Sequence, residues 1–412
     1  MADIRPFQAI RPARGLEARV AALPYDVYSR KEAYIQAAKD RLSFLNIDRP
    51  ETQFAEDTDM YAQRVYEKAG DMIRERLEQG VFVSDEKPMY YLYELTQGQH
   101  VQTGVVACAA IDDYLNHVIR EHENTREEKE ADRIRHIDAC GMQTGPVFLA
   151  YHRNAAVQEV VQRIRRQDAV FDFGSFDGVR HRGWRVSRQK DIETLQAAFG
   201  DVDRLYIADG HHRAASAVRV GQRRRRAHPD YDGTEAFNSF LAVLFPEDEL
   251  TIMDYNRAVR DLNGMTREEF LGRIAQRFEV RRCVKAKKPE KKGVFAMYLG
   301  DTWYELRLRA QYCREGVIDN LDVSVLQREL LAPVLGIADP KNDARLDFIG
   351  GVRGLEELER RVHTDCAVAF AMYPTAREEL FAVADAGLLM PPKSTWFEPK
   401  LYSGLFLHQI ER

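Results

Sequence analysis

The segment from Arg204 to Ala217 constrains the fold most, because it places a dense polar turn between an apolar strand and a helix. Residues 205–208 predict a short buried strand, and residues 214–220 predict the opening of a helix. Between them stand Asp209, Gly210, His211, His212 and Arg213. A strand-to-helix turn directs backbone N–H groups and the positive end of the helix dipole at one point, which suits a phosphate. The segment therefore predicts an anion-binding turn.

The polar residues of this turn have separate roles in such a site. Gly210 allows the backbone to approach a ligand closely, and Arg213 offers two donors to phosphate oxygens. Asp209 offers a carboxylate that could hold Mg²⁺ or take a proton. The alternative is structural, since Asp-Gly is a common turn and Asp209 could be an N-cap. Two histidines and an arginine beside it favour the functional interpretation.

A length of 412 residues predicts two or three domains. We expect an N-terminal α+β region over 1–115, a catalytic region over 116–250 and a C-terminal α+β region over 251–412. Hydrophobic residues make up 45% of the chain and charged residues 30%, which is ordinary for a soluble globular protein. A formal net charge of -5 gives no general attraction to nucleic acid or to an anionic membrane.

The cysteines and the first residues favour a cytoplasmic protein. There are five cysteines, widely scattered and without CxxC spacing, so neither a disulfide framework nor a zinc site is expected. The first residues lack a basic segment followed by an apolar run, so no signal peptide is expected. No window approaches the roughly 18 apolar residues that a membrane-spanning helix needs.

The hydrophobic pattern predicts an α+β fold of mixed sheets with packed helices. A hairpin is expected over 90–111, and an apolar strand over 240–245. Helices are expected over 59–79 and 323–335, and a further one near Arg30 that Ser29 can cap.

A second candidate site begins at His122 and Glu123, just before a helix that Asn124 or Thr125 can cap. Three cations of that helix share a face at i, i+3 and i+7, namely Arg126, Lys129 and Arg133. A carboxylate beside such cations can be a general base that faces a phosphorylated substrate. The alternative is a solvated helix with ion pairs along it. No second histidine follows at HExxH spacing, so a zinc protease site is excluded.

A third candidate is the loop Pro391-Pro392-Lys393-Ser394-Thr395, which offers an ammonium group and two hydroxyls on a stiff backbone. The loop could equally have a purely structural role in packing the C-terminal region. The pairs Asn256-Arg257 and Tyr25-Asp26 are weaker candidates at the ends of expected elements. The basic run 223–226 is typical of a solvated helix end, with contact to nucleic acid as the alternative.

Five motifs together resemble the DUF1015 family over nearly the whole chain. They are Pro24-Tyr-Asp-Val, His122-Glu-x-Thr, Asp209-Gly-His-His-Arg, Tyr255-Asn-Arg and Pro391-Pro-Lys-Ser-Thr. The Asp-Gly-His-His-Arg turn also resembles the phosphate motif of the ParB/sulfiredoxin-like superfamily, and within it the free-serine kinases. This resemblance implies a nucleotide-binding core of that type within the α+β fold.

The same resemblance implies roles for the motif residues. Glu123 would be the catalytic base, and Asp209 would position the hydroxyl group or Mg²⁺. His211, His212, Arg213 and Gly210, with His122 nearby, would hold the nucleotide and the transferring phosphoryl group. Substrate contacts would come from Lys393, Ser394, Thr395, Arg126, Lys129, Arg133, Asn256 and Arg257. The chain departs from those kinases in its greater length and in the large insert between Glu123 and Asp209.

The sequence therefore predicts a Mg²⁺-dependent phosphotransferase for a small hydroxy amino acid, serine or phosphoserine, with ATP or ADP. The reverse direction, or a phosphatase reaction with water, stays open at this stage. The alternative is a regulatory nucleotide-binding protein of the ParB-like class. A sulfiredoxin-like redox enzyme ranks last, because no cysteine lies in the phosphate motif. The expected partners are small molecules, with neither a membrane nor, in the leading interpretation, nucleic acid.

Overall fold

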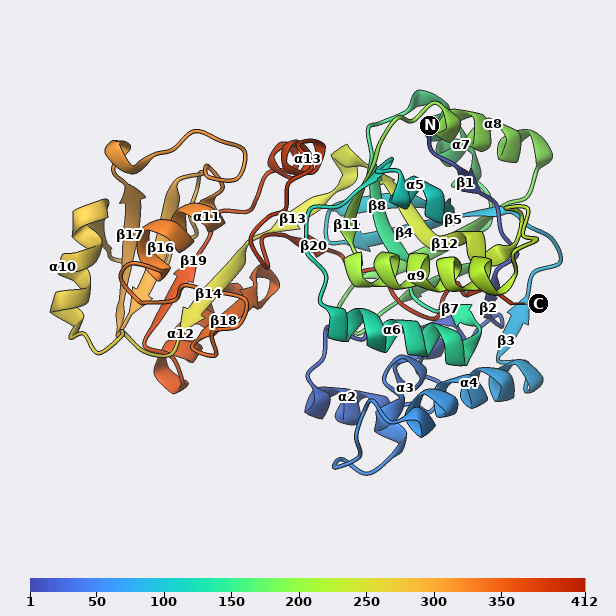
Figure 1. Ribbon diagram of the computed structural model, residues 1–412, viewed down its shortest axis with the longest axis horizontal. Helices are drawn as coiled ribbons and strands as arrows, with labels where there is room; N and C mark the ends of the chain where they lie inside the picture. The colour runs from blue at the N-terminus through green and yellow to red at the C-terminus, as the bar shows by residue number, and fades with distance from the viewer. Residues whose placement is uncertain (412) are drawn as a thin grey trace. The chain divides into compact units, whose positions relative to one another are not determined.

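The computed structural model describes residues 1–411 of the chain. They form two compact units, of which the first contains Met1–Glu121, Thr125–Leu250 and the segment from Pro399 onward. The second contains His122–Asn124 and Thr251–Glu398. The expected mixed α+β class is confirmed, with several sheets and thirteen α-helices among the described residues (Figure 1).

The first unit is built on a mixed sheet in the order β6-β11-β8-β12-β5-β4-β10-β9, with β1 paired to β5. Its strands are β1 (Ile4–Arg5), β4 (Tyr90–Gln97), β5 (His100–Ala110), β6 (Ile119–Arg120), β8 (Val147–Tyr151), β9 (Phe171–Gly174), β10 (Arg180–Val186), β11 (Leu205–Asp209) and β12 (Ser239–Pro246). The expected hairpin is β4–β5, paired antiparallel. Since β12 pairs with β5, the expected regions 1–115 and 116–250 contribute to one sheet.

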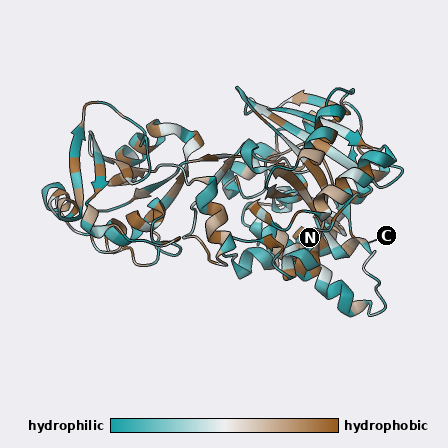
Figure 2. Cartoon of the chain, turned by 90° about the horizontal axis from the view of Figure 1, so that it is seen from above, coloured by the Kyte–Doolittle hydropathy of each residue, from teal (hydrophilic) through white to brown (hydrophobic). Residues whose placement is uncertain are grey.

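Every residue of β12 is buried, as its continuous apolar run predicts for a central strand. Figure 2 shows hydrophobic residues gathered along the strands of this sheet. Helix α9 (His211–Ala227) packs on β12 and β8, and α6 (Glu127–Cys140) packs on α9. Helix α4 (Gln63–Glu78) in turn packs on α6. Helices α9, α6 and α4 thus form successive layers over the sheet, next to the strand that leads into the polar turn.

The remaining elements of the first unit surround this core. The helices are α1 (Glu17–Val20), α2 (Arg30–Ala37), α3 (Leu45–Asp48), α5 (Ile111–Leu115), α7 (Ala155–Ile164) and α8 (Gln189–Gly200). Two short strand pairs are β2 (Ile10–Pro12) with β3 (Phe82–Ser84), and β7 (Met142–Gln143) with β21 (His408–Gln409). Ser29 caps α2 as expected, in a reciprocal capping box with Glu32.

The second unit is built on an antiparallel sheet in the order β15-β17-β16-β19-β14-β18. Its strands are β14 (Tyr255–Val259), β15 (Phe278–Cys283), β16 (Val294–Leu299), β17 (Thr302–Leu308), β18 (Leu346–Gly350) and β19 (Val368–Ala371). Its helices are α10 (Arg267–Arg277), α11 (Asp322–Leu326), α12 (Gly354–Thr364) and α13 (Arg377–Asp385). A separate ribbon pairs β13 (Thr251–Met253) with β20 (Trp396–Glu398).

Three helix expectations are wrong in detail. Helix α4 starts at Gln63 rather than near residue 59, because the Asp59 carboxylate accepts the Tyr61 N–H and forms a turn instead. Helix α9 starts at His211 rather than Ala214, so the polar cluster forms its first turn. The helix expected over 323–335 is α11 followed by a π-helical turn over Gln327–Leu331. Within residues 1–411, no helix has an apolar stretch long enough to cross a bilayer.

Candidate functional site

The polar turn joins the end of β11 to the start of α9. The register of β11 against β8 shifts between Ile207 and Asp209, and such a bulge re-aims the side chain at the strand end. Gly210 follows in the left-handed conformation, with φ of 96° and ψ of 29°. An added Cβ there would lie 3.0 Å from the Arg213 guanidinium. The turn therefore requires glycine both for its backbone and for the packing of Arg213.

Two cations hold the Asp209 carboxylate. Lys400 Nζ lies 3.3 Å from Asp209 Oδ2, and the Arg213 guanidinium lies 3.6 Å from the same oxygen. Burial opposes ionisation of this carboxyl, but Lys400 and Arg213 outweigh it and hold its pKa well below the usual range. Asp209 is therefore ionised at any physiological pH. Lys400 was not among the predicted site residues, although a lysine directly after Pro399, close to the predicted loop at 391–395, could have suggested it.

Arg213 also reaches the neighbouring strand segment, where it donates to the carbonyl of Pro146. Beside it lies a small cavity of about 30 Å³, lined among others by Tyr25, Arg133, Thr144 and Gly145. A cavity of this size can hold a water molecule. Tyr25, a weak candidate from the sequence, therefore lines the same cavity as Arg213.

The two histidines of the turn differ in their surroundings. His211 is buried, whereas His212 is half-buried and its Nε2 accepts the backbone N–H of Arg126 at 3.0 Å. An N–H can donate only to a ring nitrogen without hydrogen, so the His212 ring proton is on Nδ1. The His212 carbonyl accepts the hydroxyl of buried Ser216 at 2.6 Å, one helical turn along α9. His212 therefore connects the first turn of α9 to the start of α6.

The predicted cap of α6 is wrong. Arg126 occupies the N-cap position without a side-chain cap, and the Thr125 hydroxyl bonds Glu130 instead. Of the three predicted cations, Arg126 is exposed and Lys129 half-buried. Arg133 is buried, paired with Asp132 at 2.8 Å and stacked over the Tyr25 ring at 4.1 Å. The shared cationic face is thus interrupted at Arg133, which faces the interior of the first unit.

In the second unit, the residues around His122 meet the proline-framed loop. His122 is buried, its carbonyl accepts the Met390 N–H at 2.8 Å, and its Nε2 lies 3.3 Å from the Thr395 hydroxyl. Ser394 is also buried, and its hydroxyl donates to the Pro391 carbonyl at 2.7 Å. Two of the predicted motifs therefore share hydrogen bonds. Glu123, the predicted base, is half-buried.

Arg257 supports this loop from β14, whereas its neighbour Asn256 bonds residues outside the loop. Arg257 is buried and donates to the Lys393 carbonyl at 2.9 Å. Asn256 donates to Asp254 at 2.7 Å and accepts the Met372 N–H at 2.9 Å. Lys393 itself has a φ of 58°, an uncommon conformation for a side-chain-bearing residue, and its ammonium lies 5.9 Å from the Tyr255 ring centre. The loop is thus held in a defined and strained conformation.

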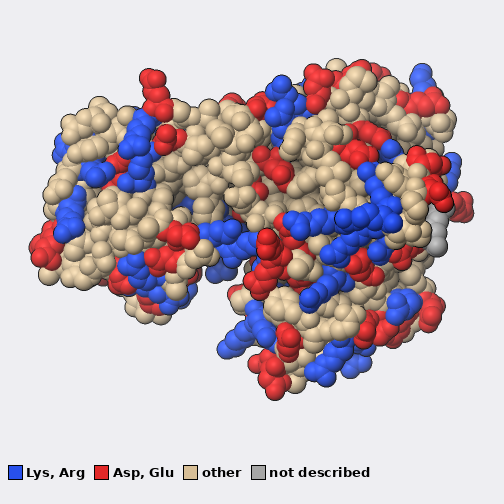
Figure 3. Space-filling model, in the orientation of Figure 1, with Lys and Arg blue, Asp and Glu red and all other residues tan. Residues whose placement is uncertain are grey.

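The basic run at the end of α9 is engaged in ion pairs. Figure 3 shows Lys and Arg side chains gathered over α9 with acidic side chains among them. Arg224 lies 3.0 Å from Asp138 of α6, and Arg225 lies 2.7 Å from Asp112. These arginines occupy the last turn of α9, where they also complement the helix dipole. This arrangement favours the structural interpretation of the run over contact with nucleic acid.

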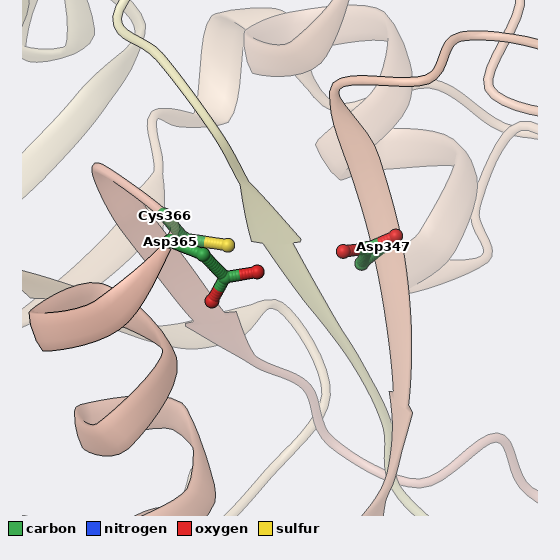
Figure 4. A group of neighbouring side chains, drawn as sticks. All are labelled: Asp347, Asp365 and Cys366. Atoms are coloured by element: carbon green, nitrogen blue, oxygen red, sulfur yellow. The ribbon is translucent and has the colours of Figure 1, made fainter. Parts of the chain in front are cut away.

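Among residues 1–411, one group of three potential metal ligands has its donor atoms close together, namely Asp347, Asp365 and Cys366 (Figure 4). Arg361 occupies this group. Its guanidinium bonds Asp365 through two nitrogens at 2.7 and 2.8 Å, pairs with Asp347 and lies 3.4 Å from the Cys366 sulfur. A cation of the protein therefore already balances the two carboxylates, and the group is an ion-pair cluster.

The chain belongs to the DUF1015 family, proteins of unknown function, whose family model matches residues 4–324. Comparison with curated proteins gives no match. Among solved structures, a free serine kinase in complex with AMP has a TM-score of 0.36 and 16% identity, covering 71% of this chain and 86% of that one. A conserved hypothetical protein from Pyrococcus furiosus has a TM-score of 0.35 and 14% identity, covering 73% and 94%. C-terminally truncated SbnI from Staphylococcus aureus has a TM-score of 0.37 and 14% identity, covering 71% and 82%.

Proposed function

We propose that the protein is a phosphotransferase for a small hydroxy amino acid, serine or phosphoserine, with ATP or ADP as the nucleotide. The observation that carries the proposal is the pair of cations, Arg213 and Lys400, at the β11–α9 turn. A left-handed glycine opens a 17-residue helix there, and Arg213 and Lys400 both contact the same oxygen of the Asp209 carboxylate. Such a turn directs the positive end of a helix dipole and two cations at the same point, which suits an anion.

Phosphoryl transfer needs placement of donor and acceptor, neutralisation of charge and a base for the attacking hydroxyl. Arg213, Lys400 and the first N–H groups of α9 would neutralise the transferring phosphoryl group. His212, whose proton is on Nδ1, would donate from that atom to a phosphate oxygen. These roles imply a ParB/sulfiredoxin-like nucleotide-binding core around the turn, with Gly210, His211 and His122 as further nucleotide-binding residues.

Glu123 would take the proton of the serine hydroxyl as its oxygen attacks the γ-phosphorus. The bond from phosphorus to the β,γ-bridging oxygen then breaks, and ADP leaves. Lys393, Ser394 and Thr395 would contact the amino acid, on a loop that Arg257 holds.

The turn offers Mg²⁺ a single carboxylate, that of Asp209, and this carboxylate is already balanced by protein cations, so Mg²⁺ would reach the site bound to the nucleotide. Since Lys400 and Arg213 already contact this carboxylate, nucleotide phosphates and water would supply most of the other ligands, as is usual for Mg²⁺. The ion would draw charge from the phosphate oxygens.

Phosphorus NMR of the full-length protein with Mg²⁺ tests the proposal. One sample holds serine with ATP, and a second holds phosphoserine with ADP. We expect a phosphoserine signal in the first sample or an ATP signal in the second, and loss of the signal in Glu123→Gln and Arg213→Gln. Arg223→Gln, which changes a surface ion pair on the same helix, is the matched control.

Free phosphate from phosphoserine alone would make the protein a phosphatase and contradict the transferase. Nucleotide-dependent thermal stabilisation without any product would instead support the regulatory nucleotide-binding protein.

A further inference from the structure

The second unit contains a cavity of about 430 Å³ beside the N-terminal end of α11, here called the α11 cavity. The start of β16, the end of β17 and the segment that leads into α11 form its walls. The lining residues are Lys291, Lys292, Gly293, Val294, Arg307, Leu308, Cys313, Arg314, Asn320, Asp322 and Val325. Its volume falls in the range of small-molecule sites, about 300–1,000 Å³.

Cations dominate the charged groups of the cavity wall. Lys291, Lys292, Arg307 and Arg314 face one acidic residue, Asp322. Lys292 pairs with Glu379, and Arg307 lies 3.7 Å from Glu305. Within residues 1–411, Lys291 and Arg314 have no ion-pair partner. The cavity therefore carries positive charge that the protein leaves unbalanced.

Asp322 reduces this positive charge only partly. Its two carboxylate oxygens lie 2.9 and 3.1 Å from the Gly293 amide nitrogen, so it ties the loop before β16 to α11. Burial raises the pKa of Asp322 to about 7, so a substantial fraction of this carboxyl is uncharged near neutral pH. Its main contribution is to the shape of the wall.

We propose that the α11 cavity binds a small phosphorylated metabolite. Lys291 and Arg314, with the partly balanced Lys292 and Arg307 beside them, match a phosphate dianion, since a guanidinium offers paired donors and an ammonium a point charge. Val294, Leu308 and Val325 supply an apolar wall for a short carbon skeleton, and Asn320 supplies an amide for its polar groups. This site lies wholly within the second unit. It is therefore tested separately from the β11–α9 turn, and its failure leaves the proposed function untouched.

Cys313 provides a local readout, because it is exposed and lines the cavity. The rate of its alkylation by iodoacetamide is measured by peptide mass spectrometry in the full-length protein. Cys283, partly exposed and outside the cavity wall, is the internal control. Glycerol 3-phosphate is the probe, glycerol is its neutral counterpart, and sodium chloride at equal ionic strength controls for screening.

We expect glycerol 3-phosphate to slow alkylation of Cys313 saturably and to leave Cys283 unchanged. In the double variant Arg307→Gln/Arg314→Gln, the concentration needed for protection rises by about tenfold or more, because two charged partners of phosphate are lost. The matched control Arg281→Gln/Lys341→Gln removes two exposed cations outside the cavity and keeps the protection. Unchanged alkylation of Cys313, equal protection in the double variant, or protection by citrate but not by glycerol 3-phosphate would each overturn the proposal.

Discussion

The ammonium group of Lys400 lies 3.3 Å from the carboxylate of Asp209, 191 residues earlier in the chain. Both residues belong to the first unit, which Pro399 and the residues after it complete. The contact places the segment that begins at Pro399 beside the polar turn. It also fixes the ionisation state of the one carboxylate that the turn contains.

Replacing Lys400 tests this contact. In Lys400→Met, we expect turnover to fall by about 10²-fold, because a preorganised cation at the transferring group is lost. In the wild type, the pKa of Asp209 in the folded state lies below its value in the unfolded state. The ionised carboxylate therefore stabilises the folded protein above about pH 4, and this stabilisation is lost as the pH falls through the folded pKa. The variant should lose that stabilisation at a higher pH, which urea unfolding at several pH values measures. Lys341→Met is the control, and an unchanged profile would contradict the pairing.

Gly210→Ala tests the geometry of the turn. A side chain at a φ of 96° costs about 1–2 kcal/mol, and its Cβ would meet the Arg213 guanidinium at 3.0 Å. We expect both lower thermal stability and loss of nucleotide binding. Gly200→Ala at the end of α8 has open space and a negative φ, so it should change stability by less than about 1 kcal/mol. Equal effects of the two substitutions would argue against a special role for Gly210.

Two substitutions of His212 should separate its structural role from its proposed role in the reaction. The Oε1 of a glutamine can accept the Arg126 N–H, whereas phenylalanine cannot. We therefore expect His212→Phe to lower the free energy of unfolding by about 1 kcal/mol and His212→Gln to lower it less. Both variants should lose turnover, because neither carries the Nδ1–H. Normal turnover in His212→Gln would remove His212 from the proposed chemistry.

His181 should make the first unit less stable in acid. It is fully buried, with Nδ1 2.7 Å from the Tyr93 hydroxyl and Nε2 3.0 Å from that of Ser175. Burial lowers its pKa to about 4, so the unfolded chain binds more protons between about pH 4 and 6.5. Stability should be unaffected by this group above pH 6.5 and fall by about 2 kcal/mol on reaching pH 5. Urea unfolding of His181→Gln at pH 7.5 and 5 should show a smaller decrease, and an identical decrease would refute the assignment.

The Asp347–Asp365–Cys366 cluster should bind metal only when Arg361 is removed. Arg361→Ala removes the arginine that pairs with both carboxylates, and because these carboxylates are partly exposed we expect the second unit to lose only about 1 kcal/mol. Mn²⁺ should then raise the melting temperature of the variant but not that of the wild type. Stabilisation of the wild type that is lost in Asp365→Asn would show that the cluster is a metal site after all.

Local patterns in the sequence were sufficient for several elements. The alternation over 90–111 predicted the β4–β5 hairpin, and the polar turn predicted the β11–α9 junction. Spacing alone could not show that Arg133 is buried, because its partner ring, Tyr25, comes from more than a hundred residues earlier. Lys400 was not predicted for the same reason, because its partner Asp209 lies 191 residues earlier in the chain. The π-helical turn after α11 depends on the Ala332 N–H bonding Gln327, which no propensity anticipates.

Because of the order of their segments along the chain, the two units can complete folding at different times during synthesis. Residues 251–398 are contiguous and almost complete the second unit, so they can collapse as soon as they leave the ribosome. The first unit must wait, because β21 pairs with β7 and Phe406 packs against Tyr91 and Phe171 only after residues 399–411 emerge. The first unit therefore begins to fold first and is completed last. A nascent chain halted near residue 398 would leave β7 without its partner strand and would expose apolar surface at Tyr91 and Phe171, the kind of surface that chaperones bind.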